Sequence, residues 1–331
     1  MKALVTGGGG FLGGVIVRML RERGEQVRSF SRGEHPALAD LGVEQIRGDL
    51  ADREVLFKAA EGCDRVFHVA AKAGIWGSYD DFYRANVTGT ENVIAACRAH
   101  GIHSLIHTSS PSVVFDGCDV EGGDESLPYP SSYEAHYPKT KALAEQLVLA
   151  AASPALATVA LRPHLIWGPG DNHLVPRIVA KGRAGKLRRI GTRPCLVDTV
   201  YVDNAARAHL QASDRLATNS SISGKAYFIT NGQPLPLWEM VNRILAAADI
   251  PPVVRSISPS MAYTIGCICE GLWGLLHLAG EPPMTRFVAH ELASAHWFNI
   301  EAARRDFGYD PEISIDEGLI RLRQWLLTCR P

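Results

Sequence analysis

A tyrosine and a lysine stand four residues apart, at Tyr137 and Lys141 in the run YPKTK. Side chains at this spacing share one face of a helix. A phenol, whose ordinary pKa is about 10, exchanges protons poorly at neutral pH. A neighbouring ammonium favours the phenolate and so eases that exchange. The pair therefore predicts a general acid for a reduction or a general base for an oxidation.

Hydroxyl groups and an amide accompany this pair. Thr108, Ser109 and Ser110 lie at the end of an apolar run that predicts a strand over 105–109. Open α/β sheets bind ligands at the carboxyl ends of their strands, and a hydroxyl there could hydrogen-bond a substrate carbonyl oxygen. Serines are also common turn residues at strand ends. Asn86 falls on the preceding predicted helix, where it could hold a proton-relay water or serve as a structural amide.

The run TGGGGFLG, from Thr6 to Gly13, lies between a predicted strand over 2–6 and a predicted helix. A tight turn, a close approach to a pyrophosphate and a close helix–strand contact each need a residue without Cβ. The N-terminus of the helix adds unpaired N–H groups and a positive dipole end. The run therefore predicts a dinucleotide site rather than a merely flexible loop. Its candidate contacts are Gly7, Gly10, Phe11, Leu12 and Gly13.

The end of the second strand, predicted over 27–31, indicates which dinucleotide binds. NAD-preferring sheets usually carry an acid there that accepts from the ribose. Here the chain reads Ser31-Arg32, with no acid before Glu34. An arginine can pair with a 2′-phosphate through its forked guanidinium, although a solvated loop arginine would give the same pattern. We therefore expect NADP(H), with Asp49 as a candidate for the adenine amino group or as a turn former.

The elements that must hold these residues alternate strand and helix through the first half of the chain. Strands are predicted over 2–6, 27–31, 43–46, 65–70, 105–109 and 158–162, and helices over 52–61, 80–100 and 133–151. This alternation predicts an α/β fold with a doubly wound parallel sheet of Rossmann type. We expect residues 1–165 to form the dinucleotide domain, with 196–232 returning to it. Residues 166–195 and 233–331 then form a smaller, C-terminal substrate domain.

The composition is that of an ordinary globular protein of 331 residues, 46% hydrophobic and 21% charged. Lys and Arg total 34 against 35 Asp and Glu, so the charge gives no case for nucleic-acid binding. Seven scattered cysteines and twelve histidines show no metal-ligand spacing. We expect reduced thiols, no metal and a cytosolic location.

Several motifs together resemble the extended short-chain dehydrogenase/reductases. They are the glycine run, HVAA at 68–71, Asn86, the Ser109–Ser110 pair, the YxxxK spacing and LRP at 161–163. The resemblance is in register along nearly the whole chain. It implies NAD(P)-dependent oxidoreduction with Ser110, Tyr137 and Lys141 as catalytic residues. It further implies that Asn86 completes a proton relay and that Lys141 holds the nicotinamide ribose. Other residues that it places in the cofactor site are Leu50, Ala70, Ala71, Lys72 and Pro163.

Within that family the chain resembles the 3β-hydroxysteroid dehydrogenase branch. The run SPS at 110–112 departs from the Thr-Asp-Glu of sugar-nucleotide dehydratases. The runs AKAGIWGSY at 71–79 and IWGPGDNH at 166–173 are similar to bacterial ketoreductases of long-chain olefin biosynthesis. That similarity implies NADPH-dependent reduction of the 3-oxo group of a long-chain 2-alkyl-3-oxoalkanoic acid. The alternatives are a 3β-hydroxysteroid or sterol 4-carboxylate 3-dehydrogenase and, from another class, a non-catalytic NADP-sensing protein.

Substrate contacts are predicted beside these runs. Lys72 is the candidate for the substrate carboxylate, and the candidates for the rest of the pocket are Trp76, Tyr79, Ser112, Trp167 and Tyr201. Each has a plainer interpretation, because lysines are mostly exposed and loop aromatics often only pack. The basic run at 177–193 is either a solvated helix face or a surface for an anion or partner.

The apolar stretch at 261–280 has the length of a membrane segment, but Glu270 and His277 interrupt it. We expect one or two helices over the pocket, with an outer face that meets a membrane or a pathway enzyme. The alternative is an ordinary core helix pair. The chain is also expected to form a homo-oligomer and to bind a β-keto acid or steroid-like small molecule.

Overall fold

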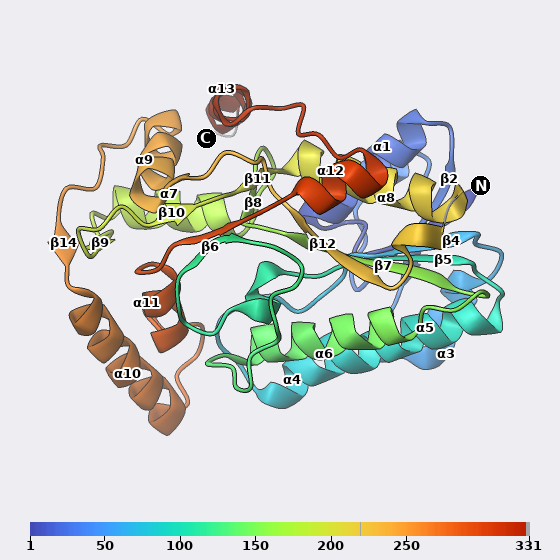
Figure 1. Cartoon of the computed structure of the whole chain (residues 1–331), viewed down its shortest axis with the longest axis horizontal. Helices are drawn as coiled ribbons and strands as arrows, with labels where there is room; N and C mark the ends of the chain where they lie inside the picture. Colours follow the sequence, from blue (N-terminus) through green and yellow to red (C-terminus); the bar gives the residue numbers. More distant parts are fainter. Residues whose placement is uncertain (219, 329–331) are drawn as a thin grey trace.

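A seven-stranded parallel sheet forms the centre of the molecule (Figure 1). The computed structural model describes residues 1–218 and 220–328. The strands follow the order β12-β7-β5-β4-β1-β2-β3, which confirms the doubly wound sheet. Their bounds are β1 Lys2–Thr6, β2 Gln26–Ser31, β3 Glu44–Arg47, β4 Arg65–His68, β5 Ser104–Thr108, β7 Ala157–Pro163 and β12 Lys225–Ile229.

Helices cover both faces of this sheet (Figure 1). The helices α1 (Phe11–Glu22) and α8 (Val202–Thr218) lie on one face, and α3 (Arg53–Ala60), α5 (Gly89–Ala99) and α6 (His136–Ala150) lie on the other. Because both faces are covered, the strands β1, β4, β5 and β7 are buried along nearly their whole length. The strand order reverses beside β1, so a ligand crevice is expected at the carboxyl ends of β1 and β4.

The expected elements of this half occur with small shifts at their ends. The helix expected over 133–151 begins at His136. The helix expected over 80–100 is divided, because a π-helical turn, η1 (Arg84–Thr88), separates α4 (Tyr79–Tyr83) from α5. This wider turn contains Asn86, whose backbone carbonyl accepts a hydrogen bond from the Thr90 hydroxyl at 2.6 Å.

The remaining chain builds smaller elements around one end of the sheet. One sheet has the order β13-β10-β15-β6, and two strand pairs are β11-β8 and β14-β9. The late strand β12 joins the edge of the main sheet beside β7. The strands are β6 Val120–Gly123, β8 Ile166–Trp167, β9 Arg189–Ile190, β10 Leu196–Val197, β11 Val200–Tyr201, β13 Leu235–Pro236, β14 Ser256–Ile257 and β15 His296–Phe298. The helices are α7 Leu174–Arg183, α9 Leu237–Ala247, α10 Pro259–Leu276, α11 Arg286–Glu291, α12 Glu301–Phe307 and α13 Ile315–Thr328. The division into two domains stays a prediction.

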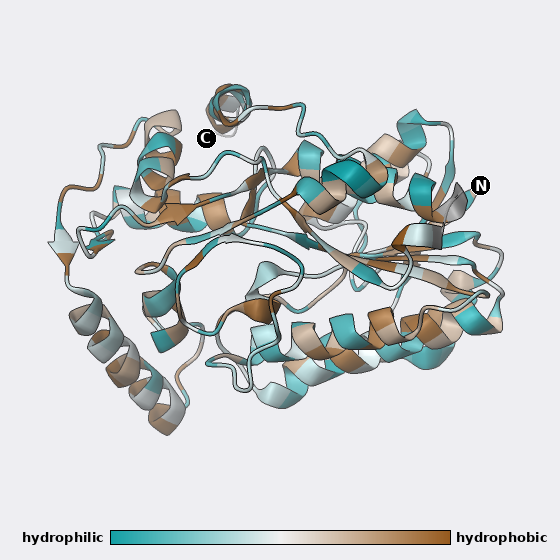
Figure 2. Ribbon diagram, in the orientation of Figure 1, coloured by the Kyte–Doolittle hydropathy of each residue, from teal (hydrophilic) through white to brown (hydrophobic). Residues whose placement is uncertain are grey.

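The helix α10 stands at one end of the molecule, apart from the main sheet (Figure 1). It sits close on α11, because a Cβ on Gly266 would lie 2.7 Å from the Arg286 backbone nitrogen. The colours of Figure 2 mark hydrophobic residues along α10. Its exposed large hydrophobic residues are Met261, Ile265, Ile268, Leu272, Leu275 and Leu276. This exposure excludes the core helix pair. Within residues 1–218 and 220–328, no helix combines the length and hydropathy needed to cross a membrane.

A buried ion pair ties β7 to α6. Arg162 donates from Nε and Nη2 to the Glu145 carboxylate at 2.6 to 3.2 Å, and both side chains are almost fully buried. The Tyr129 hydroxyl donates to the same carboxylate at 2.6 Å. Removing one partner would leave the other charge buried and uncompensated.

We predict that Glu145→Gln lowers the free energy of unfolding by about 3–5 kcal/mol, because the Arg162 guanidinium loses its counter-charge. The double variant Glu145→Leu with Arg162→Met should recover most of that loss, since no uncompensated charge remains. Urea unfolding followed by circular dichroism measures both changes. A loss below about 1 kcal/mol for Glu145→Gln, as for an exposed pair, would contradict the prediction.

Candidate active site

The glycine turn between β1 and α1 has no room for side chains. Gly7 has a φ of 71°, and a Cβ on it would lie 2.9 Å from the Ala70 Cα. A Cβ on Gly13 would lie 2.1 Å from the Gly7 carbonyl oxygen. The helix α1 begins after Gly10 without a side-chain cap, so its first N–H groups have no side-chain acceptor. This narrow, uncapped turn fits the pyrophosphate of a dinucleotide.

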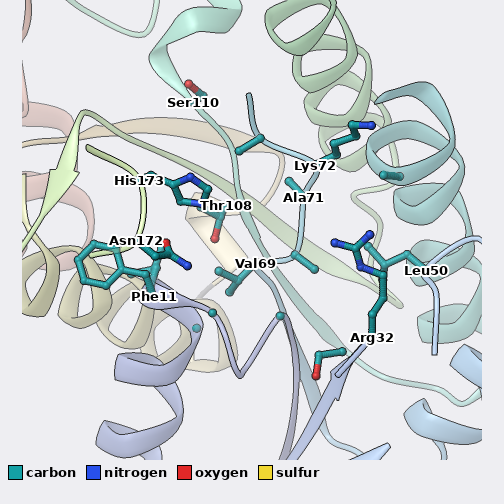
Figure 3. Close-up of a pocket in the computed structure, with 18 of the residues that line it drawn as sticks. Phe11, Arg32, Leu50, Val69, Ala71, Lys72, Thr108, Ser110, Asn172 and His173 are labelled. Carbon is teal, nitrogen blue, oxygen red and sulfur yellow. The ribbon is translucent and has the colours of Figure 1, made fainter. Parts of the chain in front are cut away.

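A cavity of about 880 Å³ extends from this turn along the carboxyl ends of the central strands (Figure 3). Ser110 lines it. So do all the residues predicted for the cofactor: Gly7, Gly10, Phe11, Leu12, Gly13, Ser31, Arg32, Asp49, Leu50, Ala70, Ala71, Lys72, Tyr137, Lys141 and Pro163. No residue of 261–280 lies on its wall, which corrects the expectation that this segment covers the pocket. The reason is that α10 packs on α11 rather than on the sheet.

The end of β2 carries a cation, and residues 31–33 include no acid. Arg32 is exposed and points toward the cavity near Leu50 (Figure 3). The Ser31 hydroxyl donates to the Gly33 carbonyl at 2.9 Å, which shapes the turn. His35 also lines this wall, and its ring lies so close to the glycine turn that a Cβ on Gly9 would come within 2.0 Å of it. The sequence analysis missed His35, because no spacing marked it.

The carboxylate of Asp49 accepts from the Ala51 backbone N–H at 2.9 Å and lies 3.7 Å from the Arg84 guanidinium. The first of these bonds is that of a turn former. The predicted contact with an adenine amino group stays a prediction.

The Lys141 ammonium is buried against β5. Its Nζ donates to the Thr108 carbonyl at 2.6 Å and lies 3.3 Å from Nε2 of His107. Burial lowers the pKa of Lys141 to about 8, although the Glu145 carboxylate acts in the opposite direction. The side chain is 2% exposed, yet it lines the cavity.

The Tyr137 phenol faces the same cavity beside Ser110. Burial raises the pKa of Tyr137, and a hydrogen bond with Ser110 partly offsets that rise. The phenol therefore keeps its proton at neutral pH. This differs from the expectation that the Lys141 ammonium favours a phenolate. The ammonium is directed instead to β5.

Ser110 begins a short 3₁₀ helix, η2 (Pro111–Val114). Its Oγ accepts from the Ser112 backbone N–H at 3.3 Å and lies 2.9 Å from the Ser112 hydroxyl. Ser112 is not on the cavity wall, so it reaches the site only through Ser110.

Asn86 lies behind the cavity wall and is 2% exposed. Its amide oxygen accepts from the Lys72 backbone N–H at 2.7 Å. Its amide nitrogen donates to the Lys72 carbonyl and to the Thr140 hydroxyl, each at 3.1 Å. Asn86 thus braces the segment after β4 against α6. Its role in a proton relay stays a prediction.

The aromatic residues predicted for the substrate do not line this cavity. Trp167 is fully buried, donates from Nε1 to the Thr199 hydroxyl at 3.0 Å and packs edge-on against Tyr201. Trp167 and Tyr201 therefore belong to the core, because the indole N–H finds its partner inside the protein. Tyr79 packs on the His136 ring, and Trp76 is half-buried in the loop before it.

Lys72 reaches the cavity wall but is engaged there. Its ammonium pairs with Asp81 at 2.9 Å and lies 5.1 Å from the centre of the Phe82 ring. A role in binding the substrate carboxylate stays a prediction. The basic run at 177–193 is also partly neutralised: Arg177 pairs with Glu281, and Arg193 binds Asp119 at 2.6 and 2.7 Å. In the described part of the chain no group of His, Cys, Asp and Glu could hold a metal ion.

Asn172 and His173 line the cavity although no role was predicted for them. Figure 3 shows His173 near Thr108 and Asn172 near Phe11. Asp171 fixes the backbone of this loop at His173, since its buried carboxylate accepts from the His173 backbone N–H at 2.7 Å. The run IWGPGDNH marked this loop by resemblance, but nothing in its spacing indicated which side chains face the cavity.

Glu291, the last residue of α11, is a second group that sequence reasoning missed. Burial raises the pKa of its carboxyl to about 7. Its negative charge in turn raises the pKa of the Tyr137 phenol. Because more than 150 residues separate the two along the chain, no local pattern could have paired them.

A glycine turn open to a pyrophosphate and a Ser–Tyr–Lys set beside it define a class, the Rossmann-type oxidoreductases that use an NAD(P) dinucleotide. The model of the 3-beta hydroxysteroid dehydrogenase/isomerase family matches residues 4–255. The chain belongs to this family, which confirms the branch expected from the motifs.

The relatives include proteins named for two of the expected activities, the reduction of a 2-alkyl-3-oxo acid and the dehydrogenation of a sterol 4-carboxylate. A 2-alkyl-3-oxoalkanoate reductase of Stenotrophomonas maltophilia is 57% identical over 98% of this chain and 98% of the relative. A decarboxylating sterol-4-alpha-carboxylate 3-dehydrogenase of Mus musculus is 36% identical over 98% of this chain and 90% of the relative. The solved UDP-glucose 4-epimerase of Thermus thermophilus, in complex with NAD, covers 100% of both chains with a TM-score of 0.75 and 24% identity, and so shows the fold alone.

Proposed function

We propose that this protein uses NADPH to reduce the 3-oxo group of a long-chain 2-alkyl-3-oxoalkanoic acid to the 2-alkyl-3-hydroxy acid, as a step in olefin hydrocarbon biosynthesis. The observation that carries the proposal is the Ser110, Tyr137 and Lys141 set on the dinucleotide cavity, in a chain 57% identical to a reductase of that name. A sterol 4-carboxylate 3-dehydrogenase is the second candidate, at 36% identity. A purely cofactor-sensing protein would not need the catalytic set.

The proposed reaction divides the work between the cofactor and three side chains. A nicotinamide held in the cavity would supply a hydride to the carbonyl carbon. Ser110 hydrogen-bonds the carbonyl oxygen and orients it, and Tyr137 gives that oxygen its phenolic proton. Lys141, which lines the same cavity and whose ammonium lies against β5, would hold the ribose of the nicotinamide. A β-keto acid loses CO₂ readily through its enol, so reduction at C3 preserves the carboxylate.

The preference for NADPH rests on the wall beside β2. Arg32 is directed toward the cavity, and no carboxylate stands at positions 31–33 to accept from a 2′-hydroxyl. A guanidinium there suits a 2′-phosphate and gives no advantage to NADH.

The direct test of the substrate is NADPH oxidation with long-chain 2-alkyl-3-oxo acids and with 3-ketosteroids, measured side by side. We expect kcat/KM to favour the oxo acids by at least about tenfold, as a difference of 1.4 kcal/mol in transition-state binding would give. A preference for the ketosteroid would favour the second candidate instead.

We predict that Tyr137→Phe lowers kcat by at least about 10²-fold while NADPH still binds. The variant loses the proton donor but keeps the other residues that line the cofactor cavity. Stopped-flow turnover and fluorescence titration of NADPH measure the two effects. Tyr83→Phe, which removes a phenol hydroxyl at an exposed position, is the matched control. Turnover within a few-fold of the unmodified protein would exclude Tyr137 as the proton donor.

We predict that Arg32→Ala weakens NADPH binding by about tenfold or more and leaves NADH binding unchanged. A charge-assisted contact with a phosphate contributes roughly 1.5–3 kcal/mol. The control is Arg183→Ala, an exposed arginine of α7 that does not line the cavity. Equal affinity of the unmodified protein for the two cofactors would refute the assignment of Arg32.

We also propose that the exposed apolar side of α10 contacts a lipid surface and that the protein is otherwise cytosolic and homo-oligomeric. A substrate with two long alkyl chains is nearly insoluble in water, so it has to be collected from lipid. The segment just after α10 borders the loop that holds Trp76, because the Ile75 backbone N–H lies 3.4 Å from Glu281 Oε1. Light scattering after gel filtration tests the oligomeric state.

We predict that Ile268→Ser with Leu275→Ser reduces flotation of the protein with phospholipid vesicles and raises KM for long-chain substrates more than for short ones. These side chains are 56% and 78% exposed, so the fold should not depend on them. Ile320→Ser, at a 54% exposed position of α13, is the control. Unchanged flotation and an equal effect on both chain lengths would show that α10 has no role in collecting lipid substrates.

A further inference from the structure

The ring of His107 is the nearest side-chain neighbour of the Lys141 ammonium on β5. Its Nε2 lies 3.3 Å from Lys141 Nζ, and the side chain is 1% exposed. The other bond of the ammonium goes to the backbone carbonyl of Thr108, at 2.6 Å. Among the described residues these are the two hydrogen-bond acceptors that the structure gives Lys141, and both are uncharged.

The nearby carboxylate does not take their place. Glu145 stands one turn further along α6, but its oxygens accept from Arg162 and from the Tyr129 hydroxyl. It therefore acts on Lys141 only through space, where it raises the pKa of the lysine against the effect of burial. A buried ammonium with no bonded carboxylate depends on whatever neutral acceptors it has.

The protonation state of His107 follows from this contact. An ammonium has no lone pair, so Nε2 must accept and the ring proton must be on Nδ1. Nδ1 is buried and has no partner in the part of the chain that the structure describes. Burial and the charge of Lys141 keep the pKa of His107 well below its usual range, so the ring is neutral. The ring thus leaves one donor unpaired while it presents its lone pair to the lysine.

The other ionisable groups around the pair are already engaged. His68 on β4 has its two ring nitrogens within 2.8 and 2.9 Å of the Thr6 and Thr90 hydroxyls. His209 on α8 lies 2.8 Å from the Thr108 hydroxyl and 2.7 Å from the Ala205 carbonyl. The groups whose charge acts on Lys141 or His107 are Glu145 on α6, His68 on β4 and His209 on α8. Neither histidine bonds to the ammonium.

We propose that His107 is a positioning residue for Lys141: its Nε2 accepts a hydrogen bond from the ammonium and holds it, charged, at the carboxyl end of β5. This inference rests on the proposed role of Lys141 in the reaction. Thr108 alone would leave the ammonium with one acceptor and free to rotate about it. With both acceptors, the third N–H of the ammonium has a fixed direction.

The consequence can be measured in the pH dependence of activity. The pKa of Lys141 is lowered to about 8, so the ammonium is present below that pH and is lost as the pH rises through it. Removing an acceptor destabilises the charged form and lowers this pKa further. The alkaline fall in activity should then begin at a lower pH.

The test compares three variants that differ in the position of the side-chain atom that could accept a hydrogen bond from the Lys141 ammonium. His107→Gln places an amide oxygen near the position of Nε2, His107→Asn reaches only as far as Nδ1, and His107→Leu has no acceptor. For each, kcat/KM is measured from pH 6 to 10 with saturating NADPH, and the dissociation constant of NADPH is measured by fluorescence over the same range. Thermal unfolding shows which variants remain folded.

We expect the alkaline limb of kcat/KM to move down by about one pH unit or more in His107→Asn and His107→Leu, the effect of losing a hydrogen bond to a charged group. NADPH binding should weaken above the same pH. His107→Gln should stay within a few tenths of a unit of the unmodified protein. If His107→Leu does not fold, the Gln and Asn pair still decides the matter.

The proposal is overturned if Gln and Asn shift both curves equally or if neither shifts them. The proposed function fails separately, if the unmodified protein does not reduce 2-alkyl-3-oxo acids. In that case the fluorescence titrations of NADPH against pH still test His107, because they need no substrate.

Discussion

A desolvated positive charge at the carboxyl end of β5 constrains the whole site. Lys141 is buried in α6, where a carboxylate one turn away would ordinarily neutralise it, but Glu145 is held by Arg162. One helix therefore carries a structural ion pair, which fixes α6 to β7, and a buried ammonium without a bonded counter-charge. Burial lowers the pKa of Lys141 to about 8, and the charge of Glu145, which acts only through space, offsets part of that effect. Because no carboxylate is bonded to the Lys141 ammonium, its charge is available to a phenol or a ribose that comes close to it.

The glycine turn imposes a matching constraint on the other side of the cavity. Gly7 approaches the Ala70 backbone so closely that the ends of β1 and β4 leave no space for a Cβ between them. The approach brings α1, with its open N–H groups, against the same crevice into which Lys141 and Tyr137 face. The glycine turn and the Tyr137–Lys141 pair thus lie along one edge of the sheet, and the distance between them is set by the width of β1, β4 and β5.

Local pattern predicted most of this edge of the sheet. The glycine turn, the end of β2 and the YPKTK run each depend on residues close together in sequence, so periodicity and spacing were sufficient to place them. The prediction that Trp167 and Tyr201 line the substrate pocket was wrong for a different reason. The two residues are close in sequence to residues of the cavity wall, but their side chains point into the core, where the Trp167 indole donates to Thr199. The direction of a side chain in a two-residue strand is set by packing, which no local sequence pattern specifies. Glu291 was missed because its effect on Tyr137 arises only when α11 folds back over the site.

The protonation state of the Tyr137 phenol decides which proton transfer it can perform from the resting state. A tyrosine can take a proton only as the phenolate, and it can give one only as the phenol. Burial raises its pKa, and the Glu291 charge raises it further, so at neutral pH the structure holds the donor form. The Ser110 hydrogen bond offsets part of that rise and keeps transfer of the proton accessible. A phenol that keeps its proton can act as the donor in the proposed reduction, in which the carbonyl oxygen gains a proton as the carbonyl carbon gains a hydride.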